Sequence, residues 1–291
     1  MRPSENWQDY KLLDASGGEK LERWGDIILI RPDPQIIWDS PKTNPLWKSA
    51  HARYLRSSSG GGSWEFYKKI PESWTVSYSG LGLKFKISPT GFKHTGLFPE
   101  QAANWEYLSK KIKSVPGGKI PAALNLFAYT GGASAACLAA GASVCHVDAS
   151  RGMTAWAKEN MTLSGLSGKP VRYIVDDCKK FAGKELRRGR RYDIIIMDPP
   201  SYGRGSGGEV WKLESAVYEL VRLCAGLLSD KPVCFVLSSY TTGLSASVSK
   251  YILEYLIRKK MGGRVLADEL GLPVEETGLY LPCGSAAVWE L

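Results

Sequence analysis

Hydrophobic residues follow two different rhythms along the chain, and the change falls near residue 94. Up to about residue 93 the apolar residues occur in short runs broken by turn residues, which is typical of β-strands. The runs predict strands at 26–31, 63–69, 75–78 and 83–87, with a loop rich in serine and glycine at 57–63. We therefore expect residues 1–93 to form a small N-terminal β-rich domain, built as a compact barrel or a meander.

From residue 94 to 291 strands and helices alternate. Apolar runs predict strands at 122–128, 143–148, 171–176, 192–198 and 233–238, and the run at 192–198 is nearly continuous, as in a central parallel strand. The segments between and after them predict helices at 134–140, at 153–163, up to residue 186, at 209–228 and at 246–259. Two last strands, 264–270 and 286–291, have only a loop between them, so they require an antiparallel pairing. The pattern therefore predicts the α/β class: a seven-stranded, doubly wound sheet, parallel except for its last strand.

Composition fits an ordinary globular protein of 291 residues, with 44% hydrophobic and 23% charged residues. No apolar run approaches the roughly 20 residues that span a bilayer, and the polar N-terminus lacks the apolar core of a secretory signal. We therefore expect a cytoplasmic protein without a membrane partner.

The cysteines and histidines indicate neither disulfides nor a metal site. The six cysteines are scattered and form no C-x-x-C pair, so we expect them to be buried free thiols. The three histidines are too far apart in the sequence for a metal site, and no metal is expected.

Positive charge is concentrated in one part of the chain. The net charge is +9, and residues 42–93 hold nine Lys and Arg against two acids, interleaved with aromatic residues. This mixture suits a polyanion whose bases can stack on aromatic rings. A solvated basic face over a tryptophan-rich core explains it equally well. The basic run 187–191 could add phosphate contacts, but a solvated loop is the favoured interpretation.

Glycines and acids follow four predicted strands at their carboxyl ends, where open α/β sheets bind ligands. The first strand leads into a Thr-Gly-Gly turn, whose glycines would let the backbone approach a ligand. The second ends at Asp148, which could accept hydrogen bonds from ribose hydroxyls or cap the next helix. The third ends at Asp176 and Asp177, and the fourth at Asp198-Pro-Pro-Ser-Tyr202, a turn stiffened by two prolines. Each motif is common alone, but together they indicate one ligand site.

The combination closely resembles the class I S-adenosylmethionine-dependent methyltransferases that modify ribosomal RNA, in the family of bacterial large-subunit cytosine-5 and guanine-N2 methyltransferases. The resemblance covers roughly residues 93–291. The matching pieces are TGLFPEQ at 95–101, NLFAYTG at 125–131, VDAS at 147–150, Asn160, DC at 177–178 and DPPSY at 198–202. The resemblance implies a methyltransferase with S-adenosylmethionine as cofactor and RNA, most simply rRNA, as partner.

The resemblance also assigns roles by position. The implied cofactor-binding residues are Phe98, Gln101, Phe127, Tyr129, Thr130, Gly131, Asp148, Ala149, Ser150, Asn160 and Asp177. Among them, Phe98 and Gln101 would cover the cofactor, Asp148 would hold its ribose and Asp177 its adenine. The implied catalytic residues are Asp198 and Pro199 beside the reacting methyl group, with Tyr202 stacked on the target base.

The chain departs from the family pattern in two places. Members that methylate carbon-5 of cytosine need a cysteine thiolate after the fifth strand, where this chain has LSSYTT at 237–242. Attack by an exocyclic amine needs only alignment and a hydrogen-bond acceptor, so we expect methylation at nitrogen. In addition, the RNA-binding module usual in the family is not recognisable before Lys93.

Other functions use the same residues. A methyltransferase of a small molecule or a protein side chain would have the same cofactor site, and RNA binding that weakens steeply with salt would distinguish RNA from these substrates. A non-catalytic RNA-binding module would lack cofactor binding. A nicotinamide dehydrogenase is disfavoured because the G-x-G-x-x-G fingerprint is missing.

Overall fold

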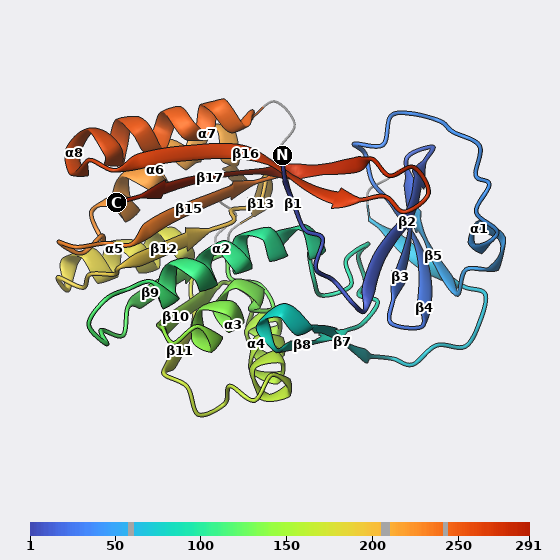
Figure 1. Cartoon of the computed structure of the whole chain (residues 1–291), viewed down its shortest axis with the longest axis horizontal. Helices are drawn as coiled ribbons and strands as arrows, with labels where there is room; N and C mark the ends of the chain where they lie inside the picture. The colour runs from blue at the N-terminus through green and yellow to red at the C-terminus, as the bar shows by residue number, and fades with distance from the viewer. Residues whose placement is uncertain (58–60, 205–209, 241–243) are drawn as a thin grey trace. The chain divides into compact units, whose positions relative to one another are not determined.

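The computed structural model describes residues 1–57, 61–204, 210–240 and 244–291, which form two compact units (Figure 1). The sheet unit comprises Met1–Arg2, Ala102–Leu270 and Gly284–Leu291. The front unit comprises Pro3–Gln101 and Gly271–Cys283. Residues 94–101 and the segment Gly271–Cys283 thus pack with the front unit. The division of the chain into functional domains of residues 1–93 and 94–291 stays a prediction. Parts of three predicted features, namely the loop at 57–63, the start of the helix at 209–228 and the end of LSSYTT, lie outside the described residues.

The sheet unit is built on the predicted twisted sheet. Its strand order is β1-β16-β17-β15-β12-β9-β10-β11. Their bounds are β1 Arg2–Pro3, β9 Ala122–Leu126, β10 Ser143–Asp148, β11 Val171–Val175, β12 Ile194–Met197, β15 Cys234–Ser239, β16 Arg264–Pro273 and β17 Tyr280–Glu290. The neighbours from β11 to β15 pair in parallel, and β17 inserts antiparallel beside β15. The predicted fold class is confirmed, and the very short β1 adds an unpredicted eighth strand.

Helices pack on the sheet in two groups, as a doubly wound fold requires. One group contains α2 (Ala102–Lys113), α3 (Gly132–Ala139) and α4 (Arg151–Leu163), and the other α5 (Cys178–Arg187), α6 (Leu213–Ala225) and α7 (Ala246–Leu253). The central strand β12 is apolar throughout, and every one of its residues is buried. The chain order reverses between β9 and β12, so the carboxyl ends of β9, β10 and β12 meet at the switch point where such sheets bind ligands.

Several elements of the sheet unit were not predicted. Helix α2 precedes the first strand, and a small hairpin, β13 (Tyr202–Arg204) with β14 (Val210–Lys212), lies between β12 and α6. The predicted helix at 246–259 is α7 followed by a π-helical turn, η3 (Glu254–Arg258), and the short α8 (Lys259–Met261). Periodicity predicted the helix but not the widened turn, since a π-turn changes the spacing by a single residue.

The front unit contains a five-stranded sheet and a separate hairpin. The sheet has the order β2-β3-β4-β5-β6, and the hairpin joins β7 and β8. Their bounds are β2 Tyr10–Ser16, β3 Glu19–Trp24, β4 Ile27–Pro32, β5 Ala52–Arg56, β6 Gly62–Phe66, β7 Trp74–Tyr78 and β8 Leu83–Ile87; the helical turns are α1 Leu46–Ser49, η1 Ser79–Leu81 and η2 Pro99–Gln101. Because β4 pairs with β5 in parallel, the sheet is not a simple meander.

A buried ion pair lies inside this front sheet. The Arg31 guanidinium donates to both carboxylate oxygens of Glu22 at 2.5 and 2.8 Å, and the Tyr10 hydroxyl donates to one of them. Glu22 is fully buried, and the neighbouring cations hold its pKa below the usual range despite the opposing effect of burial. The pair links β3, which contains Glu22, to β4, which contains Arg31. Removing either partner would leave an unpaired charge in the interior and destabilise the sheet.

Candidate active site

The loop after β9 has a strained backbone. Phe127 and Tyr129 have φ values of 56° and 50°, and in the part of the chain that the structure describes no other residue except glycine has a positive φ. Such a conformation costs on the order of 1–2 kcal/mol per residue. Two hydrogen bonds hold it: the Phe127 amide donates to Cys178 Sγ at 3.2 Å, and the Tyr129 amide to Asp148 Oδ2 at 2.8 Å. Strain that neighbours maintain in this way is frequent where a loop contacts a ligand.

Asp148 at the end of β10 is fixed in orientation. Its Oδ2 accepts the Tyr129 amide and its Oδ1 accepts the Ser150 amide, both at 2.8 Å. Each oxygen keeps a further lone pair, so the carboxylate could accept from two adjacent hydroxyl groups. Ser150, and not Asp148, caps α4, since its hydroxyl accepts from the Met153 amide at 3.3 Å. The capping interpretation of Asp148 is therefore wrong, and the geometry suits the ribose.

The two glycines of this loop are required by the protein itself. Gly131 has φ +87°, and a Cβ there would lie 2.9 Å from the Met161 side chain on α4. A Cβ on Gly132 would lie 2.4 Å from the Trp105 ring on α2. We expected these glycines to make room for a ligand. The Cβ positions instead face packed side chains, so the glycines let the start of α3 pack against α2 and α4.

Thr130 and Asn160 lie beneath the loop. Thr130 is buried, and its carbonyl accepts from Asn160 Nδ2 at 2.8 Å. The Asn160 side chain is itself fully buried. It therefore supports the loop from α4, and the cofactor contact assigned to it stays a prediction.

Asp177 at the end of β11 is exposed, and its side chain has a structural partner. Its Oδ1 accepts from the Lys180 amide at 2.8 Å and caps α5. Asp176 pairs with Lys184 at 2.6 Å. Ala149, which follows Asp148 in the chain, is exposed as well. The adenine contacts assigned to Ala149, Ser150 and Asp177 stay predictions.

Asp198 directly follows β12 and is partly buried. Burial raises the pKa of its carboxyl group from 3.8 to about 6. Pro199 is buried beside it, whereas Pro200 is exposed. Tyr202 begins β13 and is 52% exposed, and its assigned stacking on a base stays a prediction. A partly buried acid with a pKa near neutrality is a common feature of catalytic sites.

Trp211 on β14 was missed by the sequence analysis. Its indole N–H donates to the Pro200 carbonyl at 2.6 Å, and its ring lies 5.9 Å from that of Phe127. It thus connects the Asp-Pro-Pro turn to the strained loop. No local signal marks it, because both contacts depend on the β13–β14 hairpin folding back.

The end of the fifth strand provides no thiol. Ser238 and Ser239 belong to β15 and are buried, and Ser238 accepts from Asn104 Nδ2 at 3.2 Å. Thr241 and Thr242 lie outside the described residues. All six cysteines are free and buried, and burial raises the pKa of each thiol, that of Cys137 to about 12. None is therefore poised as a thiolate nucleophile.

Phe98 and Gln101 belong to the front unit. Gln101 ends η2 and donates its amide to the Phe98 carbonyl at 3.1 Å, and the Phe98 ring packs against His94. Their assigned place over the cofactor stays a prediction. Among the residues outside the three gaps, no group of three or more His, Cys, Asp or Glu residues could hold a metal ion, and no helix is both long and apolar enough to cross a membrane.

A doubly wound sheet with an antiparallel last strand and a fixed acid at the end of β10 is the arrangement of an S-adenosylmethionine-dependent methyltransferase. The family model for S-adenosylmethionine-dependent methyltransferases matches residues 19–228, so the chain belongs to this family. The predicted enzyme class, a methyltransferase that uses S-adenosylmethionine as cofactor, is confirmed.

Known proteins support this assignment. A crystal structure of the S-adenosylmethionine-dependent methyltransferase from Agrobacterium tumefaciens superposes with a TM-score of 0.91 and 37% identity, covering 99% of this chain and 92% of that one. Ribosomal RNA large subunit methyltransferase K/L of Shewanella sp. strain MR-4 is 40% identical over 123 residues, which are 42% of this chain and 16% of the relative. A methyltransferase, SMU.776, complexed with SAH has the same fold, with a TM-score of 0.75 and 18% identity.

The residues at the switch point fit this cofactor. The fixed Asp148 carboxylate matches a ribose diol, and the start of α3 directs backbone amides toward the same edge of the sheet. When bound, S-adenosylmethionine supplies a methyl group on a positively charged sulfur. Asp198, with a pKa of about 6, is the acid whose carboxylate could accept a proton during methyl transfer.

Proposed function

We propose that this methyltransferase modifies a nucleotide base of ribosomal RNA and that it transfers the methyl group to a nitrogen atom. The choice of nitrogen rests on two features considered together. The site has a partly buried acid, Asp198, and all six cysteines are buried and protonated at neutral pH. Carbon-5 chemistry requires a thiolate at the site, whereas nitrogen chemistry requires an acceptor.

The chemistry at nitrogen needs little from the protein. The Asp198 carboxylate, ionised above about pH 6, would accept a hydrogen bond from the exocyclic amine and turn its lone pair toward the methyl group. Transfer would form a carbon–nitrogen bond and break the carbon–sulfur bond of the cofactor, whose electron pair would go to sulfur. The nitrogen then loses one proton to Asp198 or to water. Pro199 would shape the turn, and Tyr202 would stack on the base.

Two further observations support RNA as the substrate. The chain has a net charge of +9, and its front unit exposes the aromatic side chains of Phe66, Tyr67 and Phe92 among the basic residues of 42–93. The Shewanella relative is named for ribosomal RNA, although the match covers 16% of that protein. In this proposal the front unit contributes to RNA binding, and a ribosomal substrate would place the protein in the cytoplasm.

The test compares RNA from cells with and without the protein by mass spectrometry of its nucleosides. We expect one nitrogen-methylated nucleoside of ribosomal RNA to disappear, and to return with the wild-type gene but not with Asp198→Ala. Loss of a carbon-5 methyl group would contradict the nitrogen assignment. An unchanged RNA profile, together with transfer to a protein or a metabolite, would favour the alternative substrates.

A further inference from the structure

The helix that follows β15 has an outer face that the methyltransferase site does not explain. The helix runs through α7, η3 and α8 as one continuous rod (Figure 1). Ile252, Leu253, Leu256 and Ile257 are buried on its inner side. On its outer side Tyr251 and Tyr255 are 70% and 45% exposed.

These two tyrosines are arranged in parallel. Their ring centroids lie 6.3 Å apart with an interplanar angle of 5°, and the Lys259 ammonium lies 4.7 Å from the centre of the Tyr255 ring. Lys250 is exposed next to Tyr251. We call Lys250, Tyr251, Tyr255 and Lys259 the tyrosine patch.

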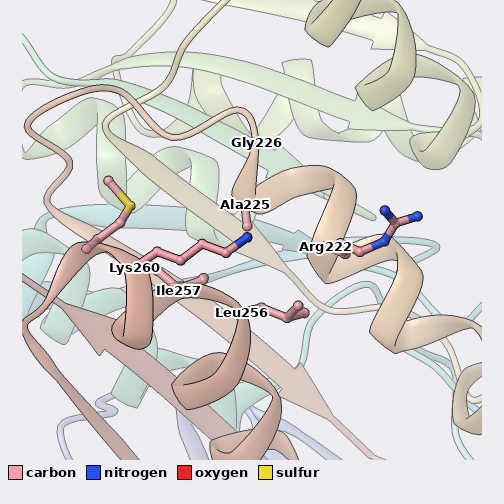
Figure 2. Close-up of a pocket in the computed structure, with 7 residues that line it drawn as sticks. Arg222, Ala225, Gly226, Leu256, Ile257 and Lys260 are labelled. Carbon is pink, nitrogen blue, oxygen red and sulfur yellow. The ribbon is translucent and has the colours of Figure 1, made fainter.

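The patch has a positive charge that continues along the helix. Residues 246–261 contain four basic residues and one acid, Glu254, which is paired with Arg258 at 2.8 Å. On the flank toward α6, Lys260 and Arg222 line a hollow of about 220 Å³, with Leu256 and Ile257 at its side. Figure 2 shows Lys260 extending toward Ala225 of α6.

The backbone of the patch is unusual as well. Tyr255 lies within the π-helical turn Glu254–Arg258. Such turns are rare overall, and many of those that occur lie at functional sites. They change the direction of side chains and interrupt the regular hydrogen bonding of the helix. Here the turn contains one of the two stacked rings.

The position of the helix connects the patch to the edge of the sheet that holds the active site. β15 runs parallel to β12, so its end at Ser239 lies at the same edge as Asp198, and α7 begins soon after it at Ala246. With a rise of 1.5 Å per residue, Tyr251 lies about 8 Å and Lys259 about 20 Å along the axis from the start of α7. The patch thus leads away from the active-site edge.

We propose that the tyrosine patch binds an unpaired segment of the RNA substrate, with bases stacked on Tyr251 and Tyr255 and phosphates beside Lys250 and Lys259. The inference rests on the proposed RNA substrate and deepens it. Proteins that bind single-stranded nucleic acids without regard to sequence stack the bases on aromatic rings and hold the phosphates with basic side chains. An acidic protein partner would be attracted by the lysines but would not need the two parallel rings.

The test measures the double variant Tyr251→Ala/Tyr255→Ala in the full chain. We expect the Kd for a fluorescein-labelled, unstructured poly(U) RNA and the KM for unmethylated ribosomal RNA to rise about tenfold or more, with the kcat and the Kd for S-adenosylmethionine unchanged. Tyr218→Ala on α6 is the matched control, since this side chain is 40% exposed outside the patch. An unchanged Kd and KM in the double variant would overturn the proposal.

A charge variant provides a second, independent readout. Lys259→Gln should reduce the slope of log Kd against log salt by about 0.7 for the labelled RNA. Lys158→Gln is the control, because Lys158 also stacks on a tyrosine, at 5.1 Å from the Tyr173 ring. Equal slopes in both variants would count against the patch, as would a double variant that changes the oligomeric state without changing RNA binding.

The two proposals can fail separately. If the wild type binds RNA through the patch but methylates none of it, the proposed function is wrong and the patch stands. If ribosomal RNA is methylated equally well by the wild type and the double variant, the function stands and the patch is wrong.

Discussion

The indole N–H of Trp211 donates a hydrogen bond to the carbonyl of Pro200, at 2.6 Å. Through this contact the hairpin after β12 holds the turn that contains Asp198, and the same ring packs near Phe127 in the strained loop. Two segments of the active site are therefore tied together by one side chain.

Replacing Trp211 tests this connection. Trp211→Phe keeps an aromatic ring but removes the hydrogen bond, which is worth on the order of 1 kcal/mol. We expect kcat/KM for methyl transfer to fall about fivefold to tenfold through kcat, with the Kd for S-adenosylmethionine changed less than about twofold. Trp289→Phe is the control, since it loses a similar hydrogen bond to the Gly262 carbonyl, and neither residue belongs to the segments of the active site. A larger loss of transfer in the control than in Trp211→Phe would contradict the positioning role.

Asp198 is predicted to trade stability for activity. Burial raises its pKa from 3.8 to about 6 in the folded state, so the folded protein holds this proton more tightly than the unfolded chain. The resulting destabilisation is absent below about pH 4, grows between about pH 4 and 6, and is complete above, where it reaches at most about 3 kcal/mol. Asp198→Asn should therefore have a higher Tm than the wild type at about pH 7.5 and the same Tm at about pH 4.

The same variant should lose activity. Methyl transfer by the wild type should decrease as the pH falls through about 6, and Asp198→Asn should be slower by about 10²-fold or more at neutral pH. Initial rates and thermal melts over the same pH series provide both measurements. A variant that melts higher yet keeps the wild-type rate would remove Asp198 from the reaction.

Asp148 is predicted to act on the cofactor alone. In Asp148→Asn the amide nitrogen would face either the Tyr129 or the Ser150 amide, since one of its two polar atoms can no longer accept. We expect the Kd for S-adenosylmethionine, measured by calorimetry, to rise about tenfold to hundredfold, without a change in RNA affinity. Asp176→Asn weakens the exposed pair with Lys184 and keeps an oxygen that can accept from the Asp177 amide, so it should bind the cofactor as the wild type does. Equal effects of the two variants would contradict the role of Asp148.

Gly132 should tolerate no side chain. A methyl group at this position would lie 2.4 Å from the Trp105 ring, so α2 and α3 would have to separate. We expect Gly132→Ala to lower the free energy of unfolding by about 1–3 kcal/mol, measured by denaturant titration. Gly168→Ala meets open space and should change stability by no more than about 0.5 kcal/mol. If both variants unfold alike, the close approach of Trp105 is not maintained in solution.

Local pattern determined most of the sheet unit. Apolar runs and turn residues predicted all seven long strands and the antiparallel insertion of the last, because burial between two helical layers demands continuous apolar segments. The strands at 143–148 and 83–87 have the predicted bounds. The acids at the strand ends, Asp148, Asp177 and Asp198, were identified because topology alone brings carboxyl ends of parallel strands to one edge.

Tertiary packing decided what the sequence left open. Gly132 could be given a reason only once Trp105 was seen against it, and Asn160 only once its side chain was seen to hold Thr130. The return of Gly271–Cys283 to the front unit, the role of Trp211 and the altered acidity of Asp198 depend equally on residues far apart in sequence. Periodicity reports which side of an element is buried, but it does not report which atoms bury it, and acidity, strain and positioning are set by those atoms.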